Sequence, residues 1–283
     1  MPLIQQLQQF ASESATTPQG RVQFRRAHAP GHAGPVTHVL LHGIGSASGN
    51  WLAQLQAAIQ SASGASHVLA WDAPGYGDSD ALPSPRPTAA DYATRMWAWL
   101  DALGAQVVQP ITLVGHSLGA LMAASASAQA TQRVQRLVLL APAQGYGNAE
   151  PALREKKLSD RLDNLSRFGP LEMARRRAAA MLSPAASDEQ RAFVQHIMAR
   201  IHVHGYTQAA YMLAGGNVAQ DLARVDCAIT VASGSADGIT PPAGCQALAR
   251  DIGTPYVDLG AVGHSCALEA GAAVNALLGL GQP

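Results

Sequence analysis

One short stretch near the middle of the chain constrains the fold most strongly. It runs from Ile111 to Ala120 with the sequence ITLVGHSLGA, and an Ala-rich segment follows it to Ala130. The β-branched, apolar start predicts a buried strand, and the segment after it predicts a helix with a face of small residues. A strand, a serine between two glycines and a helix together predict a nucleophile elbow, which lifts the Ser117 hydroxyl clear of the sheet.

The composition indicates a chain that buries a large core. The 283 residues are 48% hydrophobic and 13% charged, which excludes an intrinsically disordered protein. Lys and Arg together number 19, as do Asp and Glu, so no net charge favours nucleic acid or an anionic membrane as a partner. We therefore expect neither nucleic acid nor a membrane as a partner, and these patterns leave the oligomeric state open.

Cysteine usage and apolar runs bear on the compartment. Cys227, Cys245 and Cys266 are odd in number and lack the dense spacing of a disulfide framework. The segment from Met1 to Phe10 lacks the basic start and apolar core of a signal peptide. Because no run approaches the roughly 18 apolar residues of a membrane helix, the sequence predicts a cytoplasmic protein.

Apolar runs typical of strands alternate with segments whose apolar residues have the spacing of helices, through most of the chain. Strands are expected at 21–29, 36–42, 67–72, 111–116, 136–141, 228–234 and 255–259. Helices are expected at 51–59, at 88–103 with Thr88 as its N-cap, and at 267–278, whereas 1–20 should hold a short helix and a loop. This alternation predicts an α/β fold with a mostly parallel, doubly wound sheet and right-handed crossovers.

One block interrupts the alternation. From 144 to 224 no strand is indicated, and charge clusters such as the run 175–177 gather there. We expect 1–143 and 225–283 to form the α/β core, and 144–224 to form a helical cap inserted over the carboxyl ends of the strands, where such sheets bind ligands. The candidate substrate-binding residues of this cap are apolar side chains at helical spacing: Met173, Met181, Met198, Tyr206 and Met212.

Several short motifs make the chain resemble the α/β-hydrolase superfamily over nearly its whole length. They are His42-Gly43-Ile44-Gly45, the run DAPGYGDS at 72–79, the elbow at 115–119, Gly234-Ser235-Ala236-Asp237 with Pro241, and Gly263-His264. Each lies at the end of a predicted strand, and they follow the family's order of serine, acid and histidine. The chain looks most like the capped, cofactor-free members, which include carboxylesterases, enol-lactonases and carbon–carbon hydrolases of ring-cleavage products. The resemblance implies no cofactor.

A serine hydroxyl needs a neighbouring base, and the base needs an orienting acid. Among ten histidines, His264 is the predicted base, because it follows the last strand on a glycine-flanked loop that can reach over the sheet. Asp237 is the predicted acid, because it follows a strand at its carboxyl end. By contrast, Asp226 begins that strand at the far end, and Asp258 lies inside the final strand.

An oxyanion hole requires two backbone N–H groups that point at the developing charge. The amide of Leu118 should supply one and the amide of Ile44, in the loop after His42, the other. His42 is expected to brace that loop, and His116 is expected to be a packed core residue, because neighbours on a strand point to opposite faces.

Other reactive side chains have structural interpretations. Asp72 and Ser79 should pin the tight turn between them. His202 and His204 are more typical of a polar surface than of a metal site, because no third ligand stands at a fixed spacing, so no metal is expected. Cys266 is interpreted as a small buried residue rather than a nucleophile.

These residues predict a serine hydrolase that cleaves an ester, thioester or lactone of a small, largely apolar substrate through an acyl-enzyme. The alternative on the same triad is a carbon–carbon hydrolase of ring-cleavage diketones, although many members of that group carry Trp where this chain has Ser265. A haloperoxidase-like activity is disfavoured, since such relatives usually have Met in the place of Leu118. A ligand-binding receptor of the same fold is the alternative outside enzymes.

Overall fold

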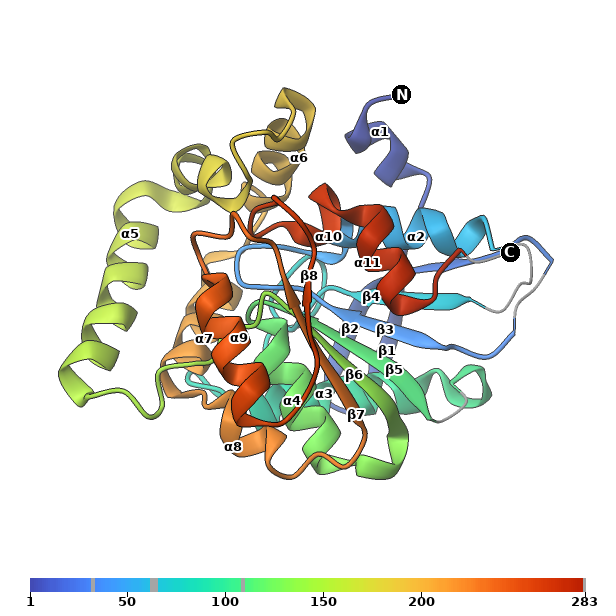
Figure 1. Cartoon of the computed structure of the whole chain (residues 1–283), viewed down its shortest axis with the longest axis horizontal. Coiled ribbons are helices and arrows are strands. Elements are labelled where there is room, and N and C mark those ends of the chain that lie inside the picture. The colour runs from blue at the N-terminus through green and yellow to red at the C-terminus, as the bar shows by residue number, and fades with distance from the viewer. Residues whose placement is uncertain (32–33, 62–65, 108–109, 282–283) are drawn as a thin grey trace.

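An eight-stranded sheet organises the fold, with the strand order β1-β2-β4-β3-β5-β6-β7-β8 (Figure 1). The computed structural model describes residues 1–31, 34–61, 66–107 and 110–281. Neighbouring strands from β4 to β8 along this order are parallel, whereas β2 is antiparallel to both β1 and β4. The strands are β1 (Ser12–Thr17), β2 (Gly20–His28), β3 (His38–Leu41), β4 (His67–Trp71), β5 (Ile111–His116), β6 (Val134–Leu140), β7 (Ala228–Ser233) and β8 (Tyr256–Asp258).

Helices cover both faces of the sheet, which confirms the predicted doubly wound α/β fold. Alternate side chains of β5 explain the two layers, because Leu113 belongs to one hydrophobic cluster and Val114 to the other. The Leu113 cluster includes residues of α3 (Ala89–Ala102), α4 (Gly119–Gln129) and α9 (Pro242–Asp251). The Val114 cluster includes residues of α1 (Leu3–Gln8), α2 (Leu52–Ile59), α10 (Cys266–Glu269) and α11 (Gly271–Leu278).

The predicted N-cap of α3 is present. The Thr88 side chain accepts a hydrogen bond from the Asp91 amide, and the Asp91 carboxylate accepts one from the Thr88 amide. Tyr92, Met96 and Trp99 then form the buried face of this helix. The cap therefore fixes where α3 begins and which of its faces meets the sheet.

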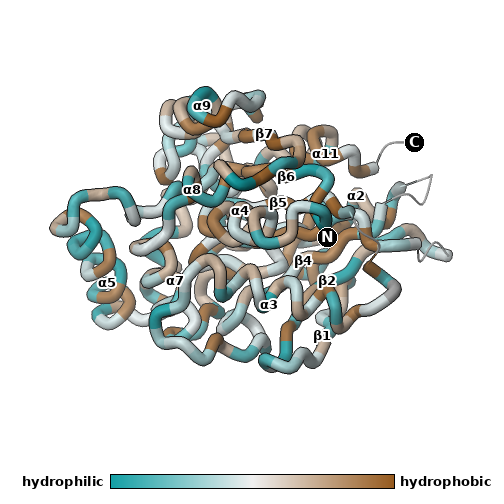
Figure 2. Tube along the Cα trace, turned by 90° about the horizontal axis from the view of Figure 1, so that it is seen from below, coloured by the Kyte–Doolittle hydropathy of each residue, from teal (hydrophilic) through white to brown (hydrophobic). Residues whose placement is uncertain are grey.

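Four α-helices lie between β6 and β7: α5 (Pro151–Arg177), α6 (Asp188–Met198), α7 (Val203–Gly215) and α8 (Val218–Leu222). Helix α5 bends at Gly169, whose φ is 65°, immediately before Pro170. It lies at the edge of the molecule and carries many hydrophilic residues, whereas hydrophobic segments gather around the sheet (Figure 2). Within the described part of the chain, every helix is too short or too polar to cross a membrane.

The structure corrects the predicted elements at both ends of the chain. Residues 12–17, expected in a loop, form β1, which pairs with β2 from Ser12 to Thr17. This strand is mostly exposed, so it lacks the hydrophobic alternation by which a strand is found in a sequence. The single helix expected at 267–278 is two helices, because Ala270 is not helical. The second helix begins at Gly271, which lies so close to Ala53 of α2 that a Cβ on it would be 2.7 Å away.

Candidate active site

Ser117 lies on a strained turn between β5 and α4. Its φ is +52°, a left-handed conformation that is uncommon for a residue with a side chain. The flanking glycines permit the turn: a Cβ on Gly115 would lie 2.5 Å from the Gly119 carbonyl oxygen, and a Cβ on Gly119 would lie 2.2 Å from that of Leu41. The turn places Ser117 in the lining of a cavity of about 250 Å³.

His264 and Asp237 form a buried pair beside this cavity. The His264 Nδ1 lies 2.9 Å from the Asp237 Oδ2, and both side chains are almost fully buried. With Nδ1–H donating to the carboxylate, the Nε2 atom is left as the basic nitrogen of the ring. His264 lines the same cavity as Ser117, although no hydrogen bond joins their side chains in the described structure. Such bonds are often long before a substrate binds.

The Asp237 carboxylate is held from several sides. Its Oδ1 accepts hydrogen bonds from the amides of Ile239, at 2.7 Å, and Thr240, at 3.0 Å. The Thr240 hydroxyl lies 2.8 Å from Oδ2 and 3.1 Å from the His264 Nδ1. Burial alone would raise the pKa of Asp237, but the hydrogen bond and charge of His264 and the two amides outweigh burial and lower the pKa. Asp237 is therefore ionised at neutral pH.

Thr240 is a site residue that sequence reasoning missed. Its hydroxyl contacts both members of the buried pair and also lies 3.0 Å from the Ala141 carbonyl oxygen at the end of β6. The available signal was its place three residues after Asp237 in a turn, a spacing at which side chains bond to nearby backbone and side-chain groups.

The two amides predicted for the oxyanion hole both border the cavity. In the described residues, the N–H groups of Ile44 and Leu118 donate no hydrogen bond to another protein group. His42 braces the loop as expected: its Nε2 accepts from the Ala73 amide at 3.0 Å, and its Nδ1 donates to the Gly43 carbonyl at 2.8 Å. Burial lowers the pKa of His42, which keeps the ring neutral for these two bonds.

The turn at 72–79 is fastened as the sequence indicates. The Ser79 hydroxyl donates to the Asp72 carbonyl oxygen at 2.6 Å. The Asp72 carboxylate accepts at 2.7 Å from the Ser48 amide, which belongs to the short 3-10 helix after the Ile44 loop. Asp72 therefore supports the loop that carries Ile44 as well as its own turn.

His116, Cys266 and His202 take the structural places expected of them. His116 is buried and its Nε2 donates to the His264 carbonyl at 2.8 Å; burial lowers its pKa to about 3, so the ring is neutral. Burial also raises the pKa of Cys266 to about 12. His202 bonds to the Gly77 carbonyl at 3.0 Å, and the described residues contain no cluster of three side chains able to hold a metal.

Four of the five candidate substrate-binding residues line the cavity with Ser117: Met173, Met181, Met198 and Tyr206. The expectation for Met212 is wrong. It lines a separate cleft on the other side of α7, and its neighbour Leu213 reaches the cavity instead. Adjacent helical residues point about 100° apart, so a shift of one position changes which side chain faces the site.

Helix α7 makes one very close contact with the turn at 72–79. A Cβ on Gly205 would lie 2.0 Å from the Gly75 carbonyl oxygen, so only glycine allows this approach. Tyr206 then lies over the Ile44 loop, because its ring comes within 3.7 Å of where a Cβ on Gly45 would stand.

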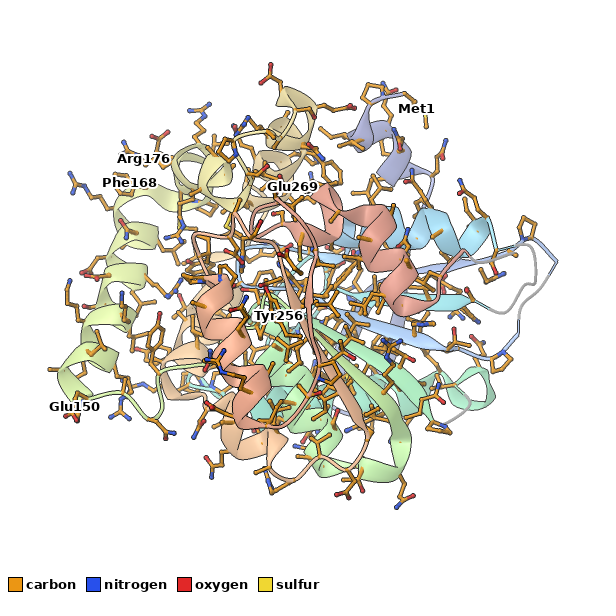
Figure 3. The ribbon with its side chains drawn as sticks, in the orientation of Figure 1. Met1, Glu150, Phe168, Arg176, Tyr256 and Glu269 are labelled. Atoms are coloured by element: carbon orange, nitrogen blue, oxygen red, sulfur yellow. The ribbon has the colours of Figure 1, made fainter. Side chains whose placement is uncertain are left out.

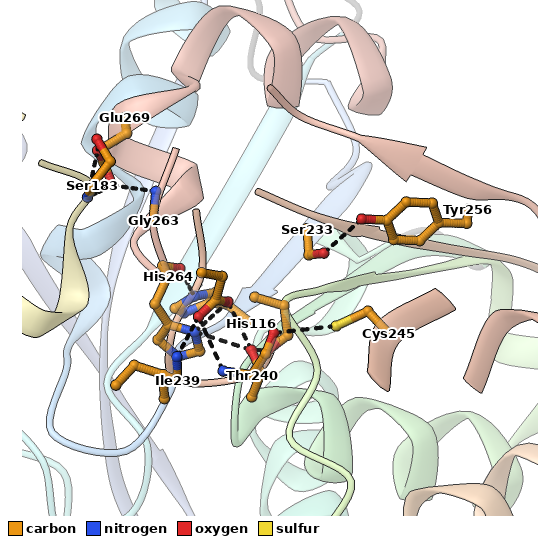
Figure 4. Close-up of polar contacts among 12 residues, drawn as sticks. His116, Ser183, Ser233, Ile239, Thr240, Cys245, Tyr256, Gly263, His264 and Glu269 are labelled. Carbon is orange, nitrogen blue, oxygen red and sulfur yellow. Dashed lines mark hydrogen bonds and ion pairs between the residues drawn. The ribbon is translucent and has the colours of Figure 1, made fainter. Parts of the chain in front are cut away.

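Glu269 is a second residue that sequence reasoning missed. Its carboxylate accepts hydrogen bonds from the amides of Gly263 and Ser183, at 2.9 and 3.0 Å, and from the Ser183 hydroxyl at 2.6 Å (Figure 4). It therefore joins the loop of His264 to the segment that follows Met181. Its partner Ser183 is 86 residues away in sequence, and no local pattern signals such a contact.

Comparison of the sequence with known proteins identifies its family. The model of the alpha/beta hydrolase family matches residues 39–277. An acetyltransferase component of an acetoin cleaving system from Cupriavidus necator is 34% identical over 41% of this chain and 29% of that protein, so this chain spans under a third of that relative.

Solved structures resemble the whole chain. A thermophilic esterase from Thermogutta terrifontis has a TM-score of 0.79 at 21% identity and covers 95% of this chain and 96% of its own. An enol-lactonase from Burkholderia xenovorans has a TM-score of 0.80 at 19% identity and covers 94% and 98%. At these identities the likeness establishes the fold.

Proposed function

Since this chain belongs to the alpha/beta hydrolase family, we propose that it is a serine hydrolase that cleaves an ester, thioester or lactone of a small substrate. The observation that supports this most is the meeting of Ser117 and His264 on one cavity, with Asp237 bonded to the far side of the imidazole at 2.9 Å. A serine and a histidine on one cavity, with an aspartate bonded to the histidine, are the groups that acyl transfer uses.

In the proposed reaction, Ser117 Oγ attacks the substrate carbonyl while His264 Nε2 takes the hydroxyl proton. The ionised Asp237 holds the imidazole in the required tautomer and stabilises the imidazolium that forms. The imidazolium gives its proton to the leaving alcohol, thiol or enol, and an acyl-enzyme remains. Water then attacks the acyl group with His264 as base, which releases the acid and restores Ser117.

The amides of Ile44 and Leu118 are proposed to bind the negative oxygen of the tetrahedral intermediate. Both border the cavity and donate no bond to another group in the described residues, so no existing interaction has to break as charge develops. Donors fixed before the reaction are effective because they need no reorganisation during it. The bonds of His42 to Gly43 and Ala73 supply that rigidity for the Ile44 loop.

The test is turnover of p-nitrophenyl esters by the wild type and by Ser117→Ala. We expect turnover in the wild type and a loss of about 10⁴- to 10⁶-fold in kcat in the variant. The control is Ser127→Ala, a buried serine whose hydroxyl donates to the Ala123 carbonyl of its own helix. A fluorophosphonate probe should label the wild type at Ser117.

Two outcomes would contradict the proposal. One is near-normal turnover by a folded Ser117→Ala variant, and the other is a wild type that turns over neither esters nor lactones. Assays with ring-cleavage diketones separate the carbon–carbon hydrolase alternative, since that activity would appear on diketones and be weak on esters.

A further inference from the structure

Two arginines of α5 lie in the wall of the same cavity. Arg161 and Arg177 both line it with Ser117, and both are half-buried. Neither guanidinium forms an ion pair or a hydrogen bond with another described residue, whereas Arg175 and Arg176 nearby pair with Glu172. No Asp or Glu is among the described lining residues. The cavity therefore holds two positive charges without a counter-ion.

The bend in α5 allows both arginines to line one cavity. In a straight helix, residues 161 and 177 would be about 24 Å apart along the axis and about 160° apart around it, on nearly opposite faces. The bend at Gly169 and Pro170 turns the second half of the helix back, and Phe168 and Arg176 pack against each other there at 4.1 Å (Figure 3). Both arginines border one cavity only because the helix is broken between them.

Arg161 and the loop that carries Ile44 line the same cavity. The Tyr76 hydroxyl accepts a hydrogen bond from the Gly45 amide at 3.4 Å. Burial raises the pKa of Tyr76 well above its usual value, and the positive charge of Arg161 acts in the opposite direction. The charge of Arg161 therefore acts on a side chain that is hydrogen-bonded to this loop.

We propose that the substrate carries a carboxylate away from the carbonyl under attack, and that Arg161 and Arg177 bind it. This proposal rests on the proposed hydrolase function and narrows its substrate class to half-esters of dicarboxylic acids. A guanidinium matches a carboxylate through two parallel N–H donors, and a buried anion needs such a partner. The apolar chain between the two carbonyl carbons would lie along Met173, Met181 and Met198.

The first experiment compares two esters of equal acyl length, mono-p-nitrophenyl adipate and p-nitrophenyl hexanoate. We expect the wild type to favour the anionic ester in kcat/KM by about 10- to 100-fold, the range of a hydrogen bond to a charged group. Arg161→Gln and Arg177→Gln should each lower this ratio by about tenfold, mainly through KM, because the contact is the same in the ground and transition states. Arg175→Gln, on the surface of the same helix, is the matched control.

The second experiment measures binding without turnover. Adipate should bind the Ser117→Ala variant, bind more weakly once Arg161→Gln is added, and bind more tightly than inorganic phosphate in calorimetry. A wild type that hydrolyses both esters equally well, an Arg variant that slows both to the same extent, or tighter binding of phosphate would each overturn the carboxylate assignment. Absence of all ester turnover would contradict the proposed function instead, and adipate binding would still decide the role of the arginines.

Discussion

The two sides of the cavity are built in different ways. The strand-end loops, which follow β3, β5, β7 and β8, are held by backbone amides and buried polar side chains, as at Asp237 and His42. The helical wall, formed by α5, α6 and α7, presents apolar side chains and two arginines. Directional bonds fix the position of an atom closely, whereas apolar contacts tolerate changes of shape. The first side therefore suits chemistry, and the second suits selection among substrates.

A few contacts tie the helical wall to the rest of the molecule. Gln208 of α7 is buried and donates to the carbonyls of Leu82 and Ser84, both at 2.7 Å. The Gly75–Gly205 contact and the Glu269–Ser183 bonds lie at other points of the same boundary. We therefore expect changes in the strand-end loops to affect the rate of reaction most, and changes in the helical wall to affect which substrate reacts.

Among variants that keep Ser117, the largest effect is expected at the carboxylate of Asp237 in the strand-end loops. Asp237→Asn should lower kcat by about 10⁴-fold, because an amide does not stabilise the imidazolium and favours the wrong tautomer. Steady-state kinetics with p-nitrophenyl esters measures this loss. Asp226→Asn and Asp258→Asn are the controls, and a greater loss in either, at equal stability, would show that another carboxylate serves His264.

His116, buried at the end of β5, should make stability depend on pH, because its pKa is about 3 against 6.5 for an ordinary histidine. Between these values the unfolded chain binds a proton that the folded protein does not, so stability falls as the pH falls. One such group contributes a slope of about 1.4 kcal/mol per pH unit to the free energy of unfolding. Denaturation by urea at several pH values should show a shallower slope in His116→Gln and an unchanged slope in His204→Gln, an exposed residue of α7. Equal slopes in all three proteins would be evidence against a neutral His116.

Glu269 lies at the boundary between the strand-end loops and the helical wall. Glu269→Gln replaces a carboxylate that accepts from Gly263 and Ser183, and an amide can offer only one acceptor oxygen. We expect a loss of about 1–3 kcal/mol in stability and a fall in kcat with little change in KM. Thermal unfolding and kinetics measure the two effects. Glu172 pairs with surface arginines, so Glu172→Gln should change neither the stability nor kcat. An equal effect in that variant would show that the bonds of Glu269 have no particular importance at this boundary.

The helical wall should set the preference for acyl length. Met181→Ala and Tyr206→Ala enlarge the cavity, so each should shift the ratio of kcat/KM between long and short esters by about 10-fold. Met212→Ala is the matched control, because it removes the same kind of side chain from α7 outside the cavity. It should lower stability by about 2–5 kcal/mol and leave the length profile unchanged. An unchanged profile in the first two variants would move the specificity element to the strand-end loops.

The smallest effect is expected on the outer face of α5. Lys156 and Asp160 form an ion pair whose side chains are 69% and 50% exposed. Lys156→Ala should therefore change stability by less than about 0.5 kcal/mol and leave kinetics unchanged. A clear change in ester preference would mean that this face, too, takes part in selecting the substrate.

The sequence by itself determined the fold class and the residues that meet at the strand ends. The pattern of Gly115, Ser117 and Gly119 predicts the elbow, because an elbow depends on local backbone geometry. A parallel sheet also brings the carboxyl ends of its strands to one edge. The same rules placed Asp237 and His264 within reach of each other. They did not find β1, whose pairing with β2 stabilises a strand that has no hydrophobic pattern of its own.

Only the tertiary structure decided what surrounds those residues. Leu213 rather than Met212 faces the cavity because of the rotation of α7, and Arg161 and Arg177 share one wall because of the bend at Gly169. Glu269 reaches Ser183 across the chain for a similar reason. Such contacts depend on how whole helices are turned and packed against the sheet, and the periodicity of a sequence gives the face of a helix but not its rotation, its bend or its partner.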